Sequence, residues 1–392
     1  MSRKVYGAGV GMTRFRRPSE GISYTELGPE AASLALIDAG LGYADIEQAY
    51  VGYSYGDNTC GQRVLYDLGL TGIPIINVNN NCATGSTALF LARQAVASGA
   101  LDCAFALGFE EMGRGALGAK WTDRKQPLEQ HVRVTREFME EVDAPWAARW
   151  FGGAGKEHQA KYGTKAETFA KIAEKARRHA AVNPNAVFRD PLTVEEILAS
   201  PMILDPLTRL QCCPPTSGAA AAVIVSEEFA KKKGLGGLVE MAAQAMTTDY
   251  PDAFNGSMIN MIGYEMAQAG SEMVFEQAGI GPSEVDVIEL HDCFTANELI
   301  TYESLGLVEP GGAEKFICDG DNTYGGKVVV NPSGGLLSKG HPLGATGLAQ
   351  CAELVWQLRG QADKRQVEGA RIGLQHNLGL GGACVITLYK AA

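Results

Sequence analysis

The chain has 392 residues, with 34 Lys and Arg against 45 Asp and Glu, so its formal net charge is −11. With 46% hydrophobic and 20% charged residues, the composition excludes a disordered chain and supplies enough apolar side chains for a large core. The acidic balance argues against general binding of nucleic acids or anionic membranes, which requires a basic surface. No apolar run approaches the ~18 residues of a membrane-spanning helix, so we expect no membrane insertion.

Nine cysteines are too few for a disulfide scaffold in a chain of this length, and their odd number leaves at least one unpaired. The first residues lack the apolar core of a secretory signal and continue directly into strand-like sequence. These features predict a reduced, cytoplasmic protein. In that compartment, a cysteine in an unusual sequence setting indicates catalysis rather than cross-linking.

Short β-branched or apolar runs alternate with helical patterns along the chain. Strands are predicted at residues 4–10, 73–78, 103–109, 285–290, 370–375 and 384–389. Helices are predicted at residues 26–38, 86–97, 265–278 and 348–358. Such alternation predicts an α/β fold in which helices cover both faces of a sheet.

The two halves of the chain resemble each other. Residues 38–47, Asp-Ala-Gly-Leu-Gly-Tyr-Ala-Asp-Ile-Glu, match residues 277–286, Gln-Ala-Gly-Ile-Gly-Pro-Ser-Glu-Val-Asp, and farther along each half Cys82 and His341 precede a long helix. Chance is the alternative, because helix–glycine–strand junctions are common. Two matches in the same order favour a duplicated α/β unit. Cys82 and His341 would then lie at equivalent helix starts and face each other between the halves.

A segment from residue 118 to about residue 210 interrupts this pattern with more charge, more Trp and longer helical stretches. Between residues 120 and 180 there are 13 Lys and Arg but only 9 Asp and Glu. We interpret the segment as an insertion in the first half that offers cations to an anionic ligand. A solvated helical face explains the charge equally well.

Cys82 follows the run Ile-Ile-Asn-Val-Asn-Asn-Asn and precedes a predicted helix. The positive end of the helix dipole and nearby N–H groups would lower the pKa of its thiol and make it a nucleophile at neutral pH. A buried structural cysteine is the alternative, and it is the usual fate of a free cysteine.

Two histidines lie in similar junctions. His291 and Cys293 end a predicted strand, where crevices form in open α/β sheets, and could supply a hydrogen-bond donor and a proton-transfer thiol. His341 lies in a turn of Gly and Pro ahead of a helix, and Pro342 suits the first helical position. Each histidine could instead be an ordinary packed or capping residue.

The stretch His376-Asn-Leu-Gly-Leu-Gly-Gly is predicted to join two strands. Its glycines could direct backbone N–H groups at an oxyanion, or could form a plain hairpin. A strand rather than a helix follows, so the stretch is not a dinucleotide fingerprint. No Walker motif is present, and without a paired Cys-x-x-Cys we expect no metal site.

Taken together, these segments resemble the thiolase family, and closely its sterol-carrier-protein-type branch. The matching segments are Asn-Asn-Asn-Cys-Ala-Thr-Gly-Ser from residue 79, Gln-Cys-Cys-Pro from 211, His-Asp-Cys-Phe from 291, Ser-Lys-Gly-His-Pro-Leu-Gly-Ala-Thr-Gly from 338 and His-Asn-Leu-Gly-Leu-Gly-Gly from 376. The resemblance runs from about residue 5 to residue 390 and includes no sterol carrier domain. Each segment alone is a weak to moderate signal, but their combination in this order is highly specific.

The resemblance implies a five-layered α-β-α-β-α fold built from two duplicated halves. Residues 1–117 and 210–235 would form the N-terminal half, residues 236–392 the C-terminal half, and residues 118–209 an inserted loop domain that binds coenzyme A. It also implies a homodimer. Coenzyme A and acyl-CoA would be substrates, no further cofactor is implied, and a small partner protein is possible.

The resemblance also implies roles for individual residues. Cys82 would be the acylated nucleophile, which His341 activates, and Cys293 would be the second acid/base. His291 and His341 would share one oxyanion hole, and the backbone N–H groups of Cys82 and Gly379 would form another.

One departure from better-known thiolases concerns the second thiol. Those enzymes have Asn-Glu-Ala-Phe where this chain has His-Asp-Cys-Phe at residue 291, and Cys-x-Gly where it has Asn377-Leu-Gly. The second thiol has therefore moved from the position of Asn377, itself a candidate oxyanion or substrate-binding residue, to Cys293, as in the sterol-carrier-type branch.

The sequence therefore predicts an acetyl-CoA acyltransferase that cleaves 3-ketoacyl-CoA with coenzyme A, or runs the reverse Claisen condensation, through an acyl-cysteine intermediate in lipid metabolism. A thiolase-fold aldolase, a ketoacyl synthase and a non-catalytic acyl-CoA-binding subunit are the alternatives. A cysteine peptidase is a weaker one, because only the pairing of Cys and His supports it.

Overall fold

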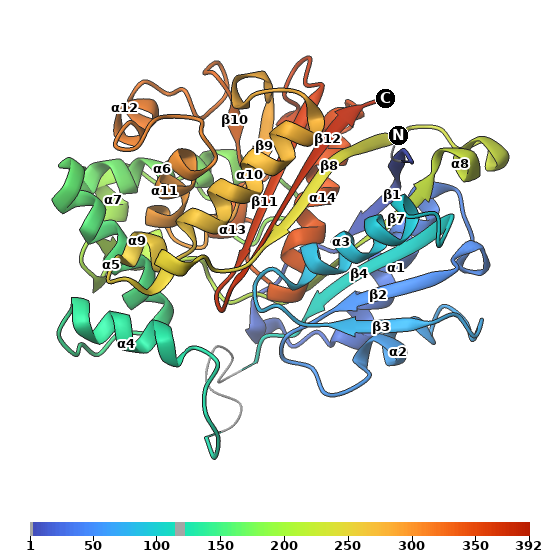
Figure 1. The fold of residues 1–392 in the computed structure, drawn as a ribbon, viewed down its shortest axis with the longest axis horizontal. Coiled ribbons are helices and arrows are strands. Elements are labelled where there is room, and N and C mark those ends of the chain that lie inside the picture. Colours follow the sequence, from blue (N-terminus) through green and yellow to red (C-terminus); the bar gives the residue numbers. More distant parts are fainter. Residues whose placement is uncertain (1–2, 114–121) are drawn as a thin grey trace.

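The computed structural model describes residues 3–113 and 122–392 (Figure 1). Ten strands form a mixed sheet in the order β10-β9-β11-β12-β8-β1-β7-β4-β2-β3. The N-terminal five are β1 Val5–Met12, β2 Gln48–Gly52, β3 Ile75–Val78, β4 Cys103–Glu110 and β7 Gly218–Ser226. The C-terminal five are β8 Val239–Thr247, β9 Val287–Glu289, β10 Val329–Val330, β11 Ile372–Gly379 and β12 Ala383–Ala391.

The duplication predicted from the sequence is present in the strand order. The N-terminal strands run β1-β7-β4-β2-β3 and the C-terminal strands run β8-β12-β11-β9-β10, with the same parallel and antiparallel pairings. The halves also join at their edges, where Tyr6 pairs with Glu240 and Gly7 with Val239. The two matching sequence segments end their helices alike, because Gly40 and Gly279 are both left-handed C-caps, with φ 66° and 67°.

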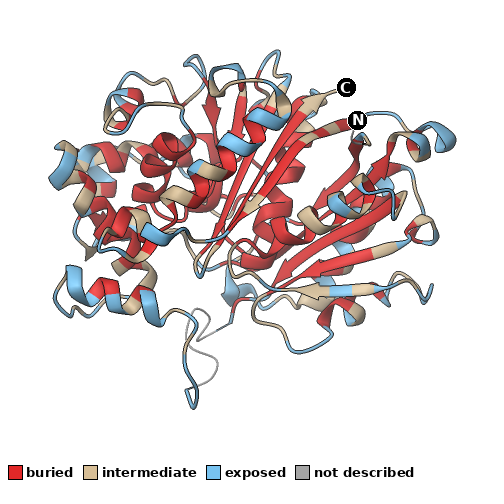
Figure 2. Cartoon of the chain, in the orientation of Figure 1, coloured by how far each residue is buried: buried red, intermediate tan, exposed pale blue. Residues whose placement is uncertain are grey.

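Helices form the remaining three layers of the predicted five-layered fold. Helix α1 (Tyr24–Ala39) covers β1 and β7, and α10 (Tyr264–Ala278) covers β8 and β12. Between the two halves lie α3 (Thr84–Ala97) and α14 (Leu343–Leu358), which pack on each other and on strands of both halves. Figure 2 shows this middle layer as buried, and every residue of α14 except Trp356 is buried. A helix that is apolar on all sides suits this position.

Between β4 and β7 the chain forms α4 Glu129–Phe138, α5 Trp146–Tyr162, α6 Ala166–Ala180, α7 Val194–Leu198, β5 Met202–Leu204 and β6 Leu207–Thr208. The other helices are α2 Cys60–Leu65, α8 Glu227–Lys233, α9 Met258–Met261, α11 Thr295–Ser304, α12 Ala313–Cys318 and α13 Gly335–Ser338. Helices α5 and α6 pack on α11 of the C-terminal half. The predicted boundary at residues 117–118 lies outside the described residues, and the domain limits stay predictions.

No helix in residues 3–113 or 122–392 is long and apolar enough to cross a membrane.

Glycines allow the two halves to approach closely at α14. A Cβ atom on Gly344 would lie 2.2 Å from the carbonyl oxygen of Phe109 and 2.7 Å from that of Gly52. One on Gly108 would lie 2.0 Å from the carbonyl oxygen of Gly344. These contacts are with backbone atoms, so no side chain can move aside. The start of α14, which follows His341, is thereby held directly against the ends of β2 and β4.

We expect Gly344→Ala to lower the free energy of unfolding by about 1–3 kcal/mol, because overpacking displaces backbone. Activity should fall as well, since the displacement moves His341 relative to the N-terminal half. Urea unfolding and steady-state assays measure the two effects. Gly236→Ala is the matched control, because a Cβ there meets nothing within 4 Å. Equal effects of the two substitutions would contradict the prediction.

Candidate active site

Cys82 lies in the short loop between β3 and α3. Asn81, directly before it, adopts a left-handed conformation with φ 52°, which Asn tolerates better than most residues. The side-chain amide of Asn81 donates to the carbonyl of Leu380, 3.1 Å away in the turn after β11. The backbone N–H of Asn80 donates to Oγ1 of Thr84 at 2.8 Å. These bonds fix the loop at the junction of the two halves.

His341 lies between α13 and α14, and its hydrogen bonds determine which ring nitrogen carries the proton. Nδ1 is 2.7 Å from Oγ1 of Thr346, whose hydroxyl donates to the carbonyl of Pro342 at 3.0 Å. Since a hydroxyl has only one proton, Thr346 accepts from Nδ1–H of His341. Nε2 is then a lone-pair acceptor, and this buried atom has no hydrogen-bond partner among the described residues.

His291 has the opposite arrangement. The amide nitrogen of Asn377 lies 2.9 Å from Nδ1 of His291, and the amide oxygen of Asn377 accepts from the hydroxyl of Ser86 at 2.8 Å. Asn377 therefore donates to Nδ1 of His291, which leaves the ring proton on Nε2. One imidazole thus presents a donor and the other an acceptor. The polar partners behind the two rings, Asn377 and Thr346, set this difference.

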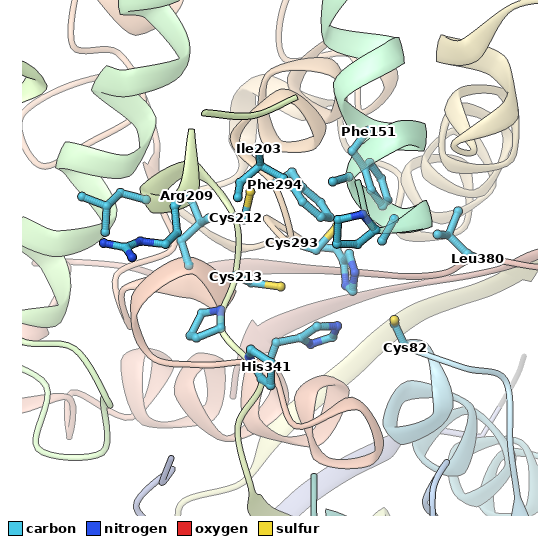
Figure 3. Close-up of a pocket in the computed structure, with 18 of the residues that line it drawn as sticks. Cys82, Phe151, Ile203, Arg209, Cys212, Cys213, Cys293, Phe294, His341 and Leu380 are labelled. Atoms are coloured by element: carbon cyan, nitrogen blue, oxygen red, sulfur yellow. The ribbon is translucent and has the colours of Figure 1, made fainter. Parts of the chain in front are cut away.

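The three side chains converge although they come from distant parts of the chain. One ligand atom each of Cys82, His291 and His341 lies within 4.8 Å of the others. The two imidazole rings are 5.0 Å apart, centre to centre, and nearly perpendicular at 85°. Figure 3 shows the sulfur of Cys82 and the ring of His341 facing one cavity from different elements. The predicted meeting of these residues between the halves is therefore found.

Cys293 lies on the wall of the same cavity, in the segment between β9 and α11. Its backbone carbonyl accepts from the N–H of Cys213 at 2.9 Å. Burial, followed by the neighbouring thiols Cys213 and Cys82, raises its pKa well above the ordinary thiol value. Cys293 is therefore protonated at neutral pH, as a proton donor must be.

The cavity has a volume of about 580 Å³. Its apolar lining includes Phe151, Ile203, Phe294, Leu337, Leu378 and Leu380. Two cations, Arg177 and Arg209, also line it, and the guanidinium of Arg177 lies 4.5 Å from the ring centre of Phe188. Both arginines belong to the segment from residue 118 to about residue 210. The cavity therefore joins a reactive end, an apolar wall and a cationic part, which suits an acyl thioester of an anionic carrier.

The structure places the two remaining candidate residues differently. A Cβ atom on Gly379 would lie 2.3 Å from the carbonyl oxygen of Asn80 and 2.9 Å from the backbone nitrogen of Ala83. The backbone of Gly379 therefore lies against the loop that carries Cys82, as an oxyanion hole shared with Cys82 requires. Asn377 is fully buried and does not line the cavity. Its contact with His291 makes it a positioning residue rather than a substrate-binding one.

The expected low pKa of Cys82 is wrong for the free protein. Burial, followed by the nearby carboxylate of Glu110, raises the pKa of Cys82 to about 12. Cys82 precedes α3 by two residues, and the helix dipole does not offset the loss of water around the sulfur. Burial also lowers the pKa of His341 to about 3. The site therefore begins as a neutral thiol and a neutral imidazole, so the proton must leave Cys82 as its sulfur attacks.

Two further expectations from the sequence need correction. His376 does not lie in a connection between strands, because β11 extends to Gly379 and the turn is confined to the next three residues. The absence of a paired Cys-x-x-Cys was the reason to expect no metal site, yet the fold brings a thiol and two imidazoles together. Spacing along the chain cannot detect ligands from three separate segments.

Burial lowers the pKa of five histidines, namely His131, His179, His291, His341 and His376. In the unfolded chain these groups bind protons near pH 6.5, but the folded protein does not. Stability is therefore fully present above about pH 6.5 and is lost as the pH falls toward the lower folded-state values. Each group contributes up to about 1.4 kcal/mol per pH unit. Urea unfolding at pH 7 and pH 5 should show a large decrease, and equal midpoints would contradict the prediction.

The sequence analysis missed Glu110, which ends β4. Its buried carboxylate accepts from the backbone N–H groups of Ser54 at 3.1 Å, Tyr55 at 3.0 Å and Gly344 at 3.0 Å. The hydroxyl of Ser54 lies 3.4 Å from the carbonyl of Asn81, next to Cys82. Glu110 thus links the loop of the thiol to the start of the helix behind His341. An acidic residue at the end of an entirely apolar strand was the signal that could have identified it.

We expect Glu110→Ala to lower the free energy of unfolding by about 3 kcal/mol or more. It leaves three backbone N–H groups without their acceptor, and each costs about 1–3 kcal/mol when buried. Urea unfolding measures the loss. Glu111→Ala is the control, because Glu111 is exposed and accepts only from the N–H of Tyr24. A loss below about 1 kcal/mol for Glu110→Ala would contradict the assignment.

Comparisons with known proteins agree with this geometry. Residues 6–228 match the family model "Thiolase, N-terminal domain", and residues 253–388 match "Thiolase C-terminal domain-like". Sterol carrier protein 2 of Rattus norvegicus is 56% identical over 392 residues, which cover 99% of this chain and 72% of that protein. Acetyl-CoA acetyltransferase of Methanothermobacter thermautotrophicus is 35% identical, over 99% of this chain and all of that protein.

Solved structures share the fold. The Ltp2-ChsH2(DUF35) aldolase has a TM-score of 0.84 and 26% identity, over 99% of this chain and 98% of that one. Human mitochondrial 3-ketoacyl-CoA thiolase in complex with CoA has a TM-score of 0.73 and 17% identity, over 100% and 98% of the two chains.

Proposed function

The chain belongs to the thiolase family of acyltransferases, and from this membership and the geometry of its cavity we propose that it cleaves 3-ketoacyl-CoA with coenzyme A, or runs the reverse condensation. The observation that carries the proposal is the convergence of Cys82, His291 and His341 within 4.8 Å, in a cavity that Cys293 also lines. The 56% identity to sterol carrier protein 2 over nearly the whole chain supports the sterol-carrier-type branch of the family.

In the first step, the sulfur of Cys82 attacks the ketone carbon of the substrate while Nε2 of His341 takes the thiol proton. The neutral His341 can accept this proton because its Nε2 has a lone pair and no other partner. The tetrahedral oxyanion binds the backbone N–H groups of Cys82 and Gly379. The bond between C2 and C3 then breaks, the acyl group stays on Cys82 as a thioester, and the electron pair passes to the acetyl-CoA enolate.

The enolate oxygen needs fixed donors in a cavity with little water. His291 supplies Nε2–H, and His341 supplies Nε2–H once it has taken the thiol proton. Cys293 protonates the enolate carbon and releases acetyl-CoA. The thiol of a second coenzyme A then attacks the acyl-Cys82 thioester, and the sulfur of Cys82 leaves. In the reverse direction, Cys293 removes the proton from acetyl-CoA.

Arg177 and Arg209 support the assignment of coenzyme A as the carrier, because guanidinium groups bind phosphates with charge-assisted hydrogen bonds. A homodimer is the proposed assembly. Its support is an exposed apolar group beside the edge strand β3, formed by Tyr66, Leu70 and Ile76. A reducing, cytoplasmic environment is proposed because all nine cysteines are free thiols. A small partner protein is a further proposal, with no surface assigned to it.

The likeness to an aldolase structure favours one second candidate, a thiolase-fold aldolase. An aldolase releases its product without an acyl-enzyme, so it needs neither free coenzyme A nor an acylated cysteine. The presence of both Cys82 and Cys293 in the cavity favours the acyltransferase.

Incubation with acetoacetyl-CoA and coenzyme A tests the proposal. The expected result is conversion to acetyl-CoA that depends on coenzyme A and shows ping-pong kinetics. Cleavage without coenzyme A would indicate an aldolase, and no conversion would indicate a binding subunit. Intact-mass measurement after brief exposure to a panel of acyl-CoAs, followed by peptide mapping, identifies the acylated residue and the acyl lengths that are accepted.

A further inference from the structure

Cys82, His291 and His341 form the group of potential metal ligands found in residues 3–113 and 122–392. Their ligand atoms, one sulfur and two ring nitrogens, all lie within 4.8 Å of one another. A thiolate and imidazoles are ligands that select Zn²⁺ and other soft or borderline cations, whereas Mg²⁺ and Ca²⁺ require oxygen ligands. Three protein ligands with a fourth position open to a cavity are the arrangement of many zinc sites that bind a further ligand.

The state of the two imidazoles suits metal binding. Nε2 of His341 is buried, carries a lone pair and has no partner among the described residues, so a metal would replace no existing hydrogen bond. Its Nδ1–H already donates to Thr346 at 2.7 Å, which is the outer contact that orients a metal-binding histidine. Both rings lack the positive charge that would repel a cation, since burial lowers their pKa.

His291 needs one rearrangement. With Nε2 on a metal its proton must move to Nδ1, and rotation of the Asn377 amide by half a turn would direct its oxygen to that proton. The hydroxyl of Ser86, which now donates to Asn377, can instead accept from the rotated amide nitrogen. The polar pair behind His291 therefore serves either tautomer.

We propose that Zn²⁺ binds reversibly to Cys82, His291 and His341 and thereby blocks the nucleophile. The metal–sulfur bond forms as the S–H bond breaks, the proton passes to solvent, and no redox change occurs. Bond lengths of about 2.3 Å to sulfur and about 2.0–2.1 Å to nitrogen require the ligand atoms to move together by roughly 1 Å. Small rotations of three side chains in a cavity of about 580 Å³ provide this movement. Metal binding follows from the ligands alone, whereas inhibition rests on the proposed function.

The test uses the wild-type protein and a readout that does not depend on turnover. Iodoacetamide is added with and without Zn²⁺, and alkylation of Cys82 is measured by peptide mapping. Zn²⁺ should slow alkylation of Cys82 at least tenfold and a chelator should restore it, while the exposed Cys318 is the internal control and should react at an unchanged rate. Co²⁺ should give a thiolate-to-metal charge-transfer band, and Mg²⁺ should have no effect. Equal alkylation of Cys82 with and without Zn²⁺ would overturn the proposal.

Two variants that keep all three ligands test the geometry. Thr346→Val and Asn377→Ala remove the outer contacts of His341 and His291, and each should weaken protection by Zn²⁺ by roughly 10–100-fold. Unchanged protection in both would overturn the assignment of the two imidazoles as ligands. If the wild-type protein binds Co²⁺ but does not cleave acetoacetyl-CoA, the metal site stands and the proposed function fails. If it cleaves the substrate but gives no Co²⁺ band and no protection, the metal site fails alone.

Discussion

We expect Cys82→Ser to lower kcat for thiolysis of acetoacetyl-CoA by roughly 10⁴-fold or more, the scale of effect when a covalent nucleophile is removed. The hydroxyl of serine has nearly the same size as the thiol, so the loop and its bonds to Asn81 and Leu380 should persist. The reason for the loss is chemical. A serine hydroxyl has a much higher pKa than a thiol and is a poorer nucleophile toward a ketone carbon when only a neutral imidazole accepts its proton.

Steady-state assay and intact-mass spectrometry check this result together. The variant should carry no acyl adduct after exposure to acetyl-CoA, whereas the wild-type protein should gain one acyl group on Cys82. Cys318→Ser is the control, because Cys318 is exposed and lies outside the residues that line the cavity. It should be acylated and active like the wild type. Near-normal thiolysis by Cys82→Ser would defeat the assignment of the nucleophile.

Cys293→Ala should separate the two half-reactions. Acylation of Cys82 by acetyl-CoA needs only the thiol, His341 and the backbone oxyanion donors, so it should proceed at close to the wild-type rate. Carbon–carbon bond cleavage and formation need a proton transfer at the carbon atom, and loss of a positioned acid/base costs about 10²–10⁴-fold. Rapid-quench mass spectrometry for acylation and the steady-state assay for the complete reaction measure the two effects.

Cys213→Ala distinguishes the second thiol from its neighbour. Cys213 lines the same cavity and is hydrogen-bonded through its backbone to Cys293, but the proposed mechanism gives its sulfur no role. Loss of carbon–carbon chemistry in Cys213→Ala with retention in Cys293→Ala would transfer the acid/base role to Cys213. Loss of acylation in Cys293→Ala would show instead that this side chain supports the nucleophile.

The local sequence was enough to predict much of the fold. The helix ends at Gly40 and Gly279, the alternation of strands and helices, and the duplicated order of elements depend on turn chemistry and apolar periodicity within short windows. The resemblance supplied the roles of Cys82 and His341. The meeting of these two residues followed from the duplication, because equivalent helix starts in a two-fold repeat approach each other at its centre.

What the sequence by itself determined, then, is the fold family, the repeat and the residue types of the reaction. Only the tertiary structure decided the protonation of the site. It makes Cys82 a neutral thiol, assigns a donor to His291 and an acceptor to His341, and turns Asn377 into a support behind the cavity. The physical reason is that a pKa or a tautomer depends on the water lost and the partners gained at one point in space. Residues such as Glu110 and Thr346 reach that point only after the chain has folded.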